Sequence, residues 1–183
     1  MKNILFITPI GHLRKFYSEV FKRFKFLELL DPTYEQVKTH IGNFDILFCA
    51  PNHQNFVIDE ELIKDSNIQC IVSPSTGLNH IDVDSVPIIS IKNDEILESI
   101  WSTAEHTLYL ILSIVRHTKP FIELQNKTLG IIGDGRLGKM VEYLCQNIFK
   151  KVIVVDKHYG DKEKLFFESD VVSLHVDLNP SSY

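Results

Sequence analysis

One short stretch of the sequence combines glycines at a spacing that can hold a phosphate. It reads G-D-G-R-L-G over residues 133–138, directly after an apolar run and directly before residues that favour a helix. In such a strand–loop–helix unit, Gly133 permits a tight turn, Gly135 lets the backbone approach a pyrophosphate, and Gly138 allows the helix to pack closely on the strand. The helix N-terminus adds unpaired N–H groups and a positive dipole end. The pattern therefore predicts a dinucleotide site.

A carboxylate stands where such a unit would recognise a ribose. The apolar run at residues 152–155 ends on Asp156, which lies 18 positions after Gly138. An acid near this spacing accepts a hydrogen bond from a ribose 2′-hydroxyl and repels a 2′-phosphate. Strand, glycines, helix, second strand and acid together favour dinucleotide binding over an ordinary strand-to-helix turn, and they favour NAD over NADP.

Length, charge and hydropathy limit the classes of protein to consider. The chain has 183 residues, 44% hydrophobic residues and a net charge of −5, which suits one large domain or two small ones with packed cores. The charge gives no case for nucleic acid, and basic residues interleaved with aromatics at residues 14–25 indicate an amphipathic helix with a solvated basic face. No apolar run reaches membrane-spanning length, and the N-terminal run is interpreted as a strand rather than a signal peptide.

The cysteines give no sign of a metal site or of a disulfide framework. Cys49, Cys70 and Cys145 are odd in number, widely separated and each in or beside an apolar run. This pattern indicates buried thiols and predicts no bound metal. We therefore expect a reducing, cytoplasmic setting.

Short apolar runs alternate with helical patterns along the chain. The expected strands lie at residues 4–8, 45–50, 70–73, 87–91, 128–132, 152–155 and 170–176. The expected helices lie at residues 13–24, 59–64, 98–117 and 139–147. Continuous apolar strands alternating with helices predict an α/β fold with parallel sheets covered on both faces.

The longest expected helix, residues 98–117, is apolar nearly all round in its second half. We expect Ser99 or Ser102 to cap this helix and Pro120 to end it. A helix of this kind is buried, either between two lobes or in a subunit contact. The boundary between the two lobes is expected near Leu97, just before the helix.

Four motifs, in chain order, resemble those of one family, the D-isomer-specific 2-hydroxyacid dehydrogenases, which include phosphoglycerate dehydrogenase. Residues 75–82, S-T-G-L-N-H-I-D, resemble the family's G-T-G-x-D-N-I-D, and residues 102–116 resemble its V-A-E-H-T…R helix. Residues 123–133, E-L-Q-N-K-T-L-G-I-I-G, resemble its E-L-x-G-K-T-L-G-I-I-G, and residues 168–175 resemble its strand E-S-D-V-V-S-L-H.

The resemblance implies a flavodoxin-like substrate lobe at residues 1–97, followed by an incomplete Rossmann NAD-binding lobe at residues 98–183. It implies NAD as cofactor, hydride transfer between nicotinamide and a small 2-hydroxy or 2-oxo acid, and a homodimer formed through the helix at residues 100–117. The family's catalytic Arg, Glu and His would all lie beyond Tyr183. No residue is therefore assigned a catalytic role, and this chain is expected to be inactive alone.

The resemblance also assigns binding residues by position. The substrate carboxylate is expected at the loop formed by Ser75, Thr76 and Gly77. Contacts with the cofactor are expected from Thr76, Thr103, Gly133, Gly135, Arg136, Leu137, Gly138, Asp156, His175 and Val176. For Thr103 and His175 an alternative stays open, namely a helix-cap hydroxyl and a strand-end histidine whose ring is satisfied within the fold.

Several positions depart from the family pattern. Ser75 replaces a glycine, Asn79 and His80 replace a D-N pair, and Asp177 replaces a proline. The segment 156–170 is short, which predicts the loss of a helix or strand from the nucleotide lobe. Two other functions stay open: a non-catalytic dinucleotide-binding or dimerisation module, and, less favoured by the glycine spacing, an S-adenosylmethionine-dependent methyltransferase.

Overall fold

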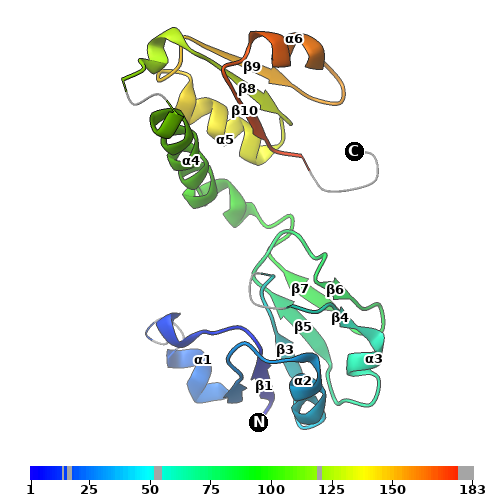
Figure 1. Cartoon of the computed structure of the whole chain (residues 1–183). Helices are drawn as coiled ribbons and strands as arrows, with labels where there is room; N and C mark the ends of the chain where they lie inside the picture. The colour runs from blue at the N-terminus through cyan, green and yellow to red at the C-terminus, as the bar shows by residue number, and fades with distance from the viewer. Residues whose placement is uncertain (14, 16–17, 52–54, 119–120, 177–183) are drawn as a thin grey trace. The chain divides into compact units, whose positions relative to one another are not determined.

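The structure is a computed structural model that describes residues 1–13, 15, 18–51, 55–118 and 121–176. The chain divides into two compact units, Met1–Leu97 and Glu98–Tyr183, and each is described by itself (Figure 1). Both units contain parallel β-sheets with helices between the strands. The predicted α/β class with parallel sheets is therefore confirmed.

A five-stranded parallel sheet of order β2-β1-β3-β5-β7 forms the centre of the first unit. Its register pairs Leu5 with Leu47 and Leu47 with Ile71, so one buried residue on each of three neighbouring strands falls in a row. The strands are β1 (Asn3–Phe6), β2 (Lys25–Glu28), β3 (Ile46–Phe48), β5 (Cys70–Ser73) and β7 (Ile88–Ser90). A separate two-stranded ladder pairs β4 (Ile58–Asp59) with β6 (Ile81–Asp82).

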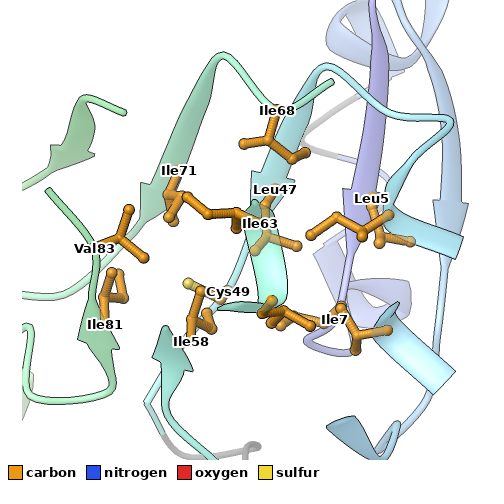
Figure 2. Packing of buried hydrophobic residues seen from close by; sticks show 13 residues of the cluster. Leu5, Ile7, Leu47, Cys49, Ile58, Ile63, Ile68, Ile71, Ile81 and Val83 are labelled. Carbon is orange, nitrogen blue, oxygen red and sulfur yellow. The ribbon is translucent and has the colours of Figure 1, made fainter. Parts of the chain in front are cut away.

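The core of the first unit lies between this sheet and its helices. Figure 2 shows Leu5, Leu47 and Ile71 beside one another, with Ile63 close to them. Cys49 belongs to the same cluster, and burial raises the pKa of its thiol to about 12. A thiol in this setting stays protonated and inert. Cys145 is likewise buried in the second unit, which confirms two of the three predicted buried thiols.

Local capping explains where two of the first unit's helices begin. Thr33 and Gln36 form a capping box, in which the Thr33 hydroxyl accepts from the Gln36 N–H and the Gln36 amide oxygen accepts from the Thr33 N–H. Asp59 accepts from the Leu62 N–H at 2.9 Å. The helices that begin in this unit are η1 (Gly11–Leu13), α1 (Ser18–Arg23), α2 (Tyr34–Ile41), α3 (Glu60–Ile63) and η2 (Glu95–Ser99), the last of which crosses the boundary at Leu97.

The second unit has a three-stranded parallel sheet of order β10-β8-β9. Its first strand is central, and the chain adds β9 on one side and β10 on the other. In the doubly wound order 3-2-1-4-5-6, these strands take places 1, 2 and 4. Among the described residues no strand takes place 3, where the short segment predicted a missing element. The elements are α4 (Ser102–Thr118), η3 (Leu124–Asn126), β8 (Thr128–Ile132), α5 (Arg136–Cys145), β9 (Lys151–Val155), α6 (Lys162–Glu168) and β10 (Val171–Leu174).

Part of the helix predicted at residues 13–24 is wrong, because Lys15 lies in a turn and α1 begins at Ser18. The strand β2, which begins at Lys25 directly after this range, was not predicted. The Phe26 ring packs edge-on against Phe6 at 6.0 Å and lies 4.5 Å from the Phe21 ring, between centroids. Packing of these aromatic rings and pairing with β1 outweigh the helical periodicity that the sequence shows.

Within the described part of the second unit, α4 packs one face against α5, where Ile111 is buried, while Tyr109 and Ile114 on the helix are 62% and 58% exposed. Burial of this helix between two lobes or in a subunit contact stays a prediction. The helix begins at Ser102, so neither predicted serine occupies the capping position before it, and Pro120 lies outside the described residues. No helix in the described part of the chain is long and apolar enough to cross a membrane.

The unpredicted helix α6 packs on the sheet through Leu165 and is joined to β9 by the ion pair of Glu168 with Lys151. Leu165 is fully buried, and a Cβ built on Gly130 would meet its Cδ2 atom at 2.7 Å. The Asp161 carboxylate caps the helix by accepting from the Lys164 N–H at 3.0 Å. The helix therefore covers β8 directly, at a position that admits no side chain on the strand.

Replacing Leu165 by alanine tests this anchor. We expect Leu165→Ala to destabilise the second unit by about 2–4 kcal/mol, because it opens a cavity in a fully buried position. Phe167→Ala on the same helix is the matched control, since Phe167 is 93% exposed, and it should change stability by less than about 0.5 kcal/mol. Urea unfolding followed by the fluorescence of Trp101, the only tryptophan, reports on this unit. Equal effects of the two substitutions would contradict the account.

Candidate functional site

The carboxyl ends of β8 and β10 meet at the point where the strand order of the second unit reverses. Gly133 follows β8, and His175 follows β10. The His175 N–H donates to the Ile132 carbonyl at 2.7 Å, and a Cβ on Gly133 would collide with the His175 carbonyl oxygen. In open parallel sheets, ligands bind outside the carboxyl ends of the strands at such a switch point. The fold therefore brings the predicted glycine loop to the expected place.

The three glycines of the loop are required for different reasons. Gly133 has a φ of +102°, and a Cβ on Gly138 would collide with the carbonyl oxygen of Gly133. The chain's own packing therefore demands glycine at these two positions. Gly135 has ordinary dihedral angles, and no atom lies within 4 Å of the place of its Cβ. Nothing within the chain demands glycine there, so its absent side chain leaves room for a ligand.

Gly135 also directly precedes the first residue of α5, Arg136. It occupies the N-cap position with no side-chain hydrogen bond, and the first turn of α5 contains no acid. The first N–H groups of a helix have no partner inside the helix and carry a partial positive charge. Open space at Gly135 and these N–H groups together fit the pyrophosphate of a dinucleotide.

Arg136 and Leu137, which were also predicted to contact a pyrophosphate, lie in the first turn of α5 and are half-buried. The Arg136 guanidinium lies along the helix, with its Nη1 atom 3.4 Å from the Met140 sulfur and 3.5 Å from the Ile100 carbonyl oxygen. The second distance is long for a hydrogen bond. This side chain would have to turn to contact a phosphate.

The predicted ribose acid, Asp156, faces the glycine loop. Its Oδ2 atom accepts from the Asp134 N–H at 3.2 Å, and its Oδ1 atom accepts from the His158 N–H at 3.4 Å. The Asp134 N–H is the main cause that lowers the pKa of Asp156, with the His158 N–H as a smaller one. The carboxylate is therefore ionised at neutral pH and fixed beside the loop, where it can accept from a hydroxyl.

His175 and Val176, which were predicted to contact the cofactor, lie against Gly133 of the loop, and the His175 ring is already engaged. Its Nε2 atom lies 2.9 Å from the Ser173 hydroxyl. The ring is half-buried, and burial lowers the pKa of His175. This geometry matches the alternative of a strand-end histidine with a satisfied ring. The backbone, which packs on Gly133, is the part of His175 that shapes the site.

The other predicted residues lie at the start of α4 and in the loop that follows β5. Thr103 is exposed in the first turn of α4, and its carbonyl accepts from the Thr107 hydroxyl at 2.9 Å. Ser75, Thr76 and Gly77 form the loop that follows β5 in the first unit, where Thr76 and Gly77 are exposed.

Two departures from the family pattern, Ser75 and His80, are joined by hydrogen bonds. The Ser75 hydroxyl donates to the Gly77 carbonyl at 2.9 Å and lies 2.8 Å from the Ser73 hydroxyl, which lies 3.0 Å from His80 Nε2. A hydroxyl has one proton, so Ser73 donates to Ser75 and accepts from a protonated His80 Nε2. This chain of bonds fixes the shape of the exposed loop, and burial lowers the pKa of His80.

Two residues that were not predicted as site residues, Asp134 and Tyr159, also belong to the site of the second unit. Asp156 and Tyr159 form an antiparallel bridge through two backbone hydrogen bonds, and Gly160 follows with a φ of +87°. Hydrogen bonding to the Asp134 carboxylate is the main cause that raises the pKa of Tyr159 to about 12. An acid inside the glycine loop and a tyrosine before a glycine were the available signals in the sequence.

Comparison with known proteins identifies the second unit. Residues 103–183 match the family description "D-isomer specific 2-hydroxyacid dehydrogenase, NAD binding domain". The second unit is therefore similar to the NAD-binding domain of this family. It is 28% identical over 143 residues to a D-specific alpha-keto acid dehydrogenase of Enterococcus faecium, covering 66% of this chain and 44% of the relative. It is also 28% identical over 176 residues to an erythronate-4-phosphate dehydrogenase of Wigglesworthia glossinidia brevipalpis, covering 91% of this chain and 45% of the relative.

A solved structure of this 2-hydroxyacid dehydrogenase family extends the likeness to nearly the whole chain. The NAD⁺-bound 3-phosphoglycerate dehydrogenase of Entamoeba histolytica matches with a TM-score of 0.72 and 26% identity, covering 98% of this chain and 64% of that protein. The chain thus spans about half the length of the curated relatives it matches. The prediction of NAD as the cofactor is confirmed.

The different demands on the glycines of the dehydrogenase domain can be measured as stability. We expect Gly133→Ala to cost at least about 1–3 kcal/mol, because it forces a non-glycine residue to a positive φ and into the His175 carbonyl. Gly135→Ala should cost less than about 1 kcal/mol, since its dihedral angles suit any residue and only a helix-cap preference is lost. Trp101 fluorescence in urea measures both. Equal losses would contradict the assignment of Gly135 to a ligand.

The half-buried His175 predicts a loss of stability in acid. Because burial lowers its pKa in the folded state, the unfolded chain binds the proton more readily. The stability of the second unit should therefore fall as the pH drops below the ordinary histidine pKa of 6.5. His175→Gln should flatten this fall, whereas the exposed His106→Gln should leave it unchanged. Urea unfolding between pH 5 and pH 8 measures the slope, and the same slope in all three proteins would refute the expectation.

Proposed function

We propose that this chain supplies the NAD site and the substrate-carboxylate loop of a D-2-hydroxyacid dehydrogenase that transfers hydride between nicotinamide and a small 2-hydroxy or 2-oxo acid. One observation carries the proposal: within the glycine loop, Gly133 and Gly138 are closed by the chain's own packing, and Gly135 alone is open. That open position stands at a helix N-terminus and at a topological switch point.

Different residues of the second unit bind different parts of the cofactor. The pyrophosphate lies on the N-terminus of α5, where Gly135 leaves room and Arg136 and Leu137 frame the first turn. Asp156 accepts from the adenosine ribose. When NAD is bound, its nicotinamide supplies or accepts the hydride. The remaining predicted contacts, Thr103, His175 and Val176, line the cofactor from α4 and from the end of β10.

The loop at residues 75–77 holds the substrate. Its exposed backbone at Thr76 and Gly77 receives the carboxylate. Ser75 fills the place of a glycine and fastens the loop from within through its bond to the Gly77 carbonyl. The names of the curated relatives support this substrate class, since they act on an alpha-keto acid and on erythronate 4-phosphate.

We assign no residue of this chain to proton transfer. The side chains at the described site accept or donate hydrogen bonds, and the one histidine beside the loop, His175, is engaged with Ser173. The 183-residue chain by itself is therefore proposed to bind NAD without turning over substrate. A reducing, cytoplasmic setting remains part of the proposal and rests on the buried, unpaired thiols.

A homodimer through α4 is the proposed assembly. Tyr109, Leu110 and Ile114 leave an apolar face of this helix exposed in the single chain. The same face favours the alternative of a non-catalytic dimerisation module. Sedimentation with and without NADH separates the two functions, because a module of that kind would dimerise without binding the nucleotide.

Titration with NADH tests the proposed function. We expect saturable binding with no oxidation of NADH when pyruvate is added. Asp156→Ala should weaken binding roughly ten-fold, since it removes a charge-assisted hydrogen bond to the ribose. Gly135→Val should weaken it more, because its side chain fills the open space at the helix terminus. Glu163→Ala, an exposed acid on α6, is the control. A folded chain that binds no NADH would overturn the proposal.

A further inference from the structure

A second carboxylate stands at the adenosine end of the proposed NAD site. Asp134 is the variable residue between Gly133 and Gly135, and its backbone N–H donates to Asp156 Oδ2 at 3.2 Å. The two acids are therefore neighbours in space although 22 positions separate them in the sequence. A site of this kind needs only one acid to recognise a ribose hydroxyl, so the second requires its own explanation.

A tight turn beside the glycine loop fixes the place of Asp134. The Asp156 N–H donates to the Tyr159 carbonyl at 3.0 Å, and the Tyr159 N–H donates back to the Asp156 carbonyl at 3.3 Å. A Cβ on Gly160 would meet the Val155 side chain at 2.8 Å, so the turn lies close against the end of β9. The turn places the Tyr159 hydroxyl beside the Asp134 carboxylate, and the hydroxyl donates a hydrogen bond to that carboxylate.

No cation neutralises this pair of acids in the described part of the chain. None of the ion pairs formed by the described residues includes Asp134 or Asp156. Glu142 of α5 adds a third negative charge that acts on the Tyr159 hydroxyl, together with Asp134 and Asp156. The charged side chain of His158 is among the causes that lower the pKa of Asp156, and it acts less than the Asp134 N–H does. The adenosine end of the site is therefore negative beyond what one ribose-binding acid provides.

We propose that Asp134 is a second specificity-determining residue, which acts with Asp156 to exclude the 2′-phosphate of NADP from the adenosine end of the site. Tyr159 holds the Asp134 carboxylate at the glycine loop by donating to it. Asp156 contacts the ribose and repels a phosphate, whereas Asp134 contributes repulsion and leaves ribose binding to its neighbour. The inference rests on the proposed function, because it assumes that the nucleotide binds at this loop.

The proposal separates two effects that a single acid would combine. Removing the charge of Asp134 should strengthen the binding of NADPH and leave the affinity for NADH nearly unchanged, because the ribose 2′-hydroxyl does not bond to Asp134. Removing the charge of Asp156 should weaken the binding of NADH and strengthen the binding of NADPH. Asp134→Asn is the suitable change, since asparagine keeps the size of the side chain and an oxygen that can accept from Tyr159.

The test measures dissociation constants of NADH and NADPH for the 183-residue chain, for Asp134→Asn and for Asp156→Asn, with the exposed Glu163→Gln as control for loss of one charge. We expect Asp134→Asn to tighten NADPH about five-fold while NADH changes less than two-fold, as a unit charge at a partly solvated site would give. Glu163→Gln should change neither. Raising the salt concentration with the unaltered chain should narrow the difference between the two nucleotides, because screening weakens the repulsion.

The outcomes distinguish this inference from the function on which it rests. NADH binding with the same NADH-to-NADPH preference in Asp134→Asn would overturn the role of Asp134 and leave the proposed function standing. Failure of the unaltered chain to bind either nucleotide would overturn both. If Asp134→Asn does not fold, the salt dependence decides, and a preference that salt does not alter would overturn the electrostatic account.

Discussion

The second unit depends on a close approach of backbone to backbone at the end of β8. The chain leaves β8 through a glycine with a positive φ, passes under the carbonyl of His175, and enters α5 so tightly that Gly138 lies on the carbonyl of Gly133. Side chains at either glycine would push helix and strands apart. Because Gly138 packs directly on the Gly133 carbonyl, the N-terminus of α5 lies at the carboxyl end of β8. Gly135, the glycine between them in the sequence, has open space around the position of its missing side chain.

The two polar clusters of the molecule act on loops rather than on reacting atoms. In the first unit, Ser73, Ser75 and His80 pass hydrogen bonds from a buried strand end to an exposed loop carbonyl. In the second unit, the Asp156 carboxylate joins the end of β9 to the glycine loop by accepting from the Asp134 N–H, and a backbone bridge ties Asp156 to Tyr159. Each cluster ties a loop to the end of a rigid strand and so holds the loop in one shape. Binding of a ligand with several charged parts requires such fixed positions.

The sequence predicted the elements whose signal is local. The strands β5 and β8 and the glycine loop follow from continuous apolar runs and from glycine spacing, and they lie where expected. The strand β2 could not be predicted, because its one aromatic residue, Phe26, continues the spacing of the helical pattern before it, and the strand forms by pairing with β1 and by packing against Phe6. The apolar residues of α4 do not reveal which neighbour covers them, so the sequence leaves the partner of Tyr109, which is exposed in the single chain, undetermined. The pairing of Asp134 with Asp156 depends on a turn between distant residues, which no local pattern encodes.

The central claim is that the glycine loop at the switch point of the second unit is the NAD site. Amide hydrogen exchange of the 183-residue chain, measured with and without saturating NADH, tests it most directly because it locates binding along the backbone. The account predicts slower exchange at residues 133–140, which include the loop and the start of α5, and at residues 156–160 beside it. Slower exchange confined to other segments, or no change at saturation, would contradict the claim.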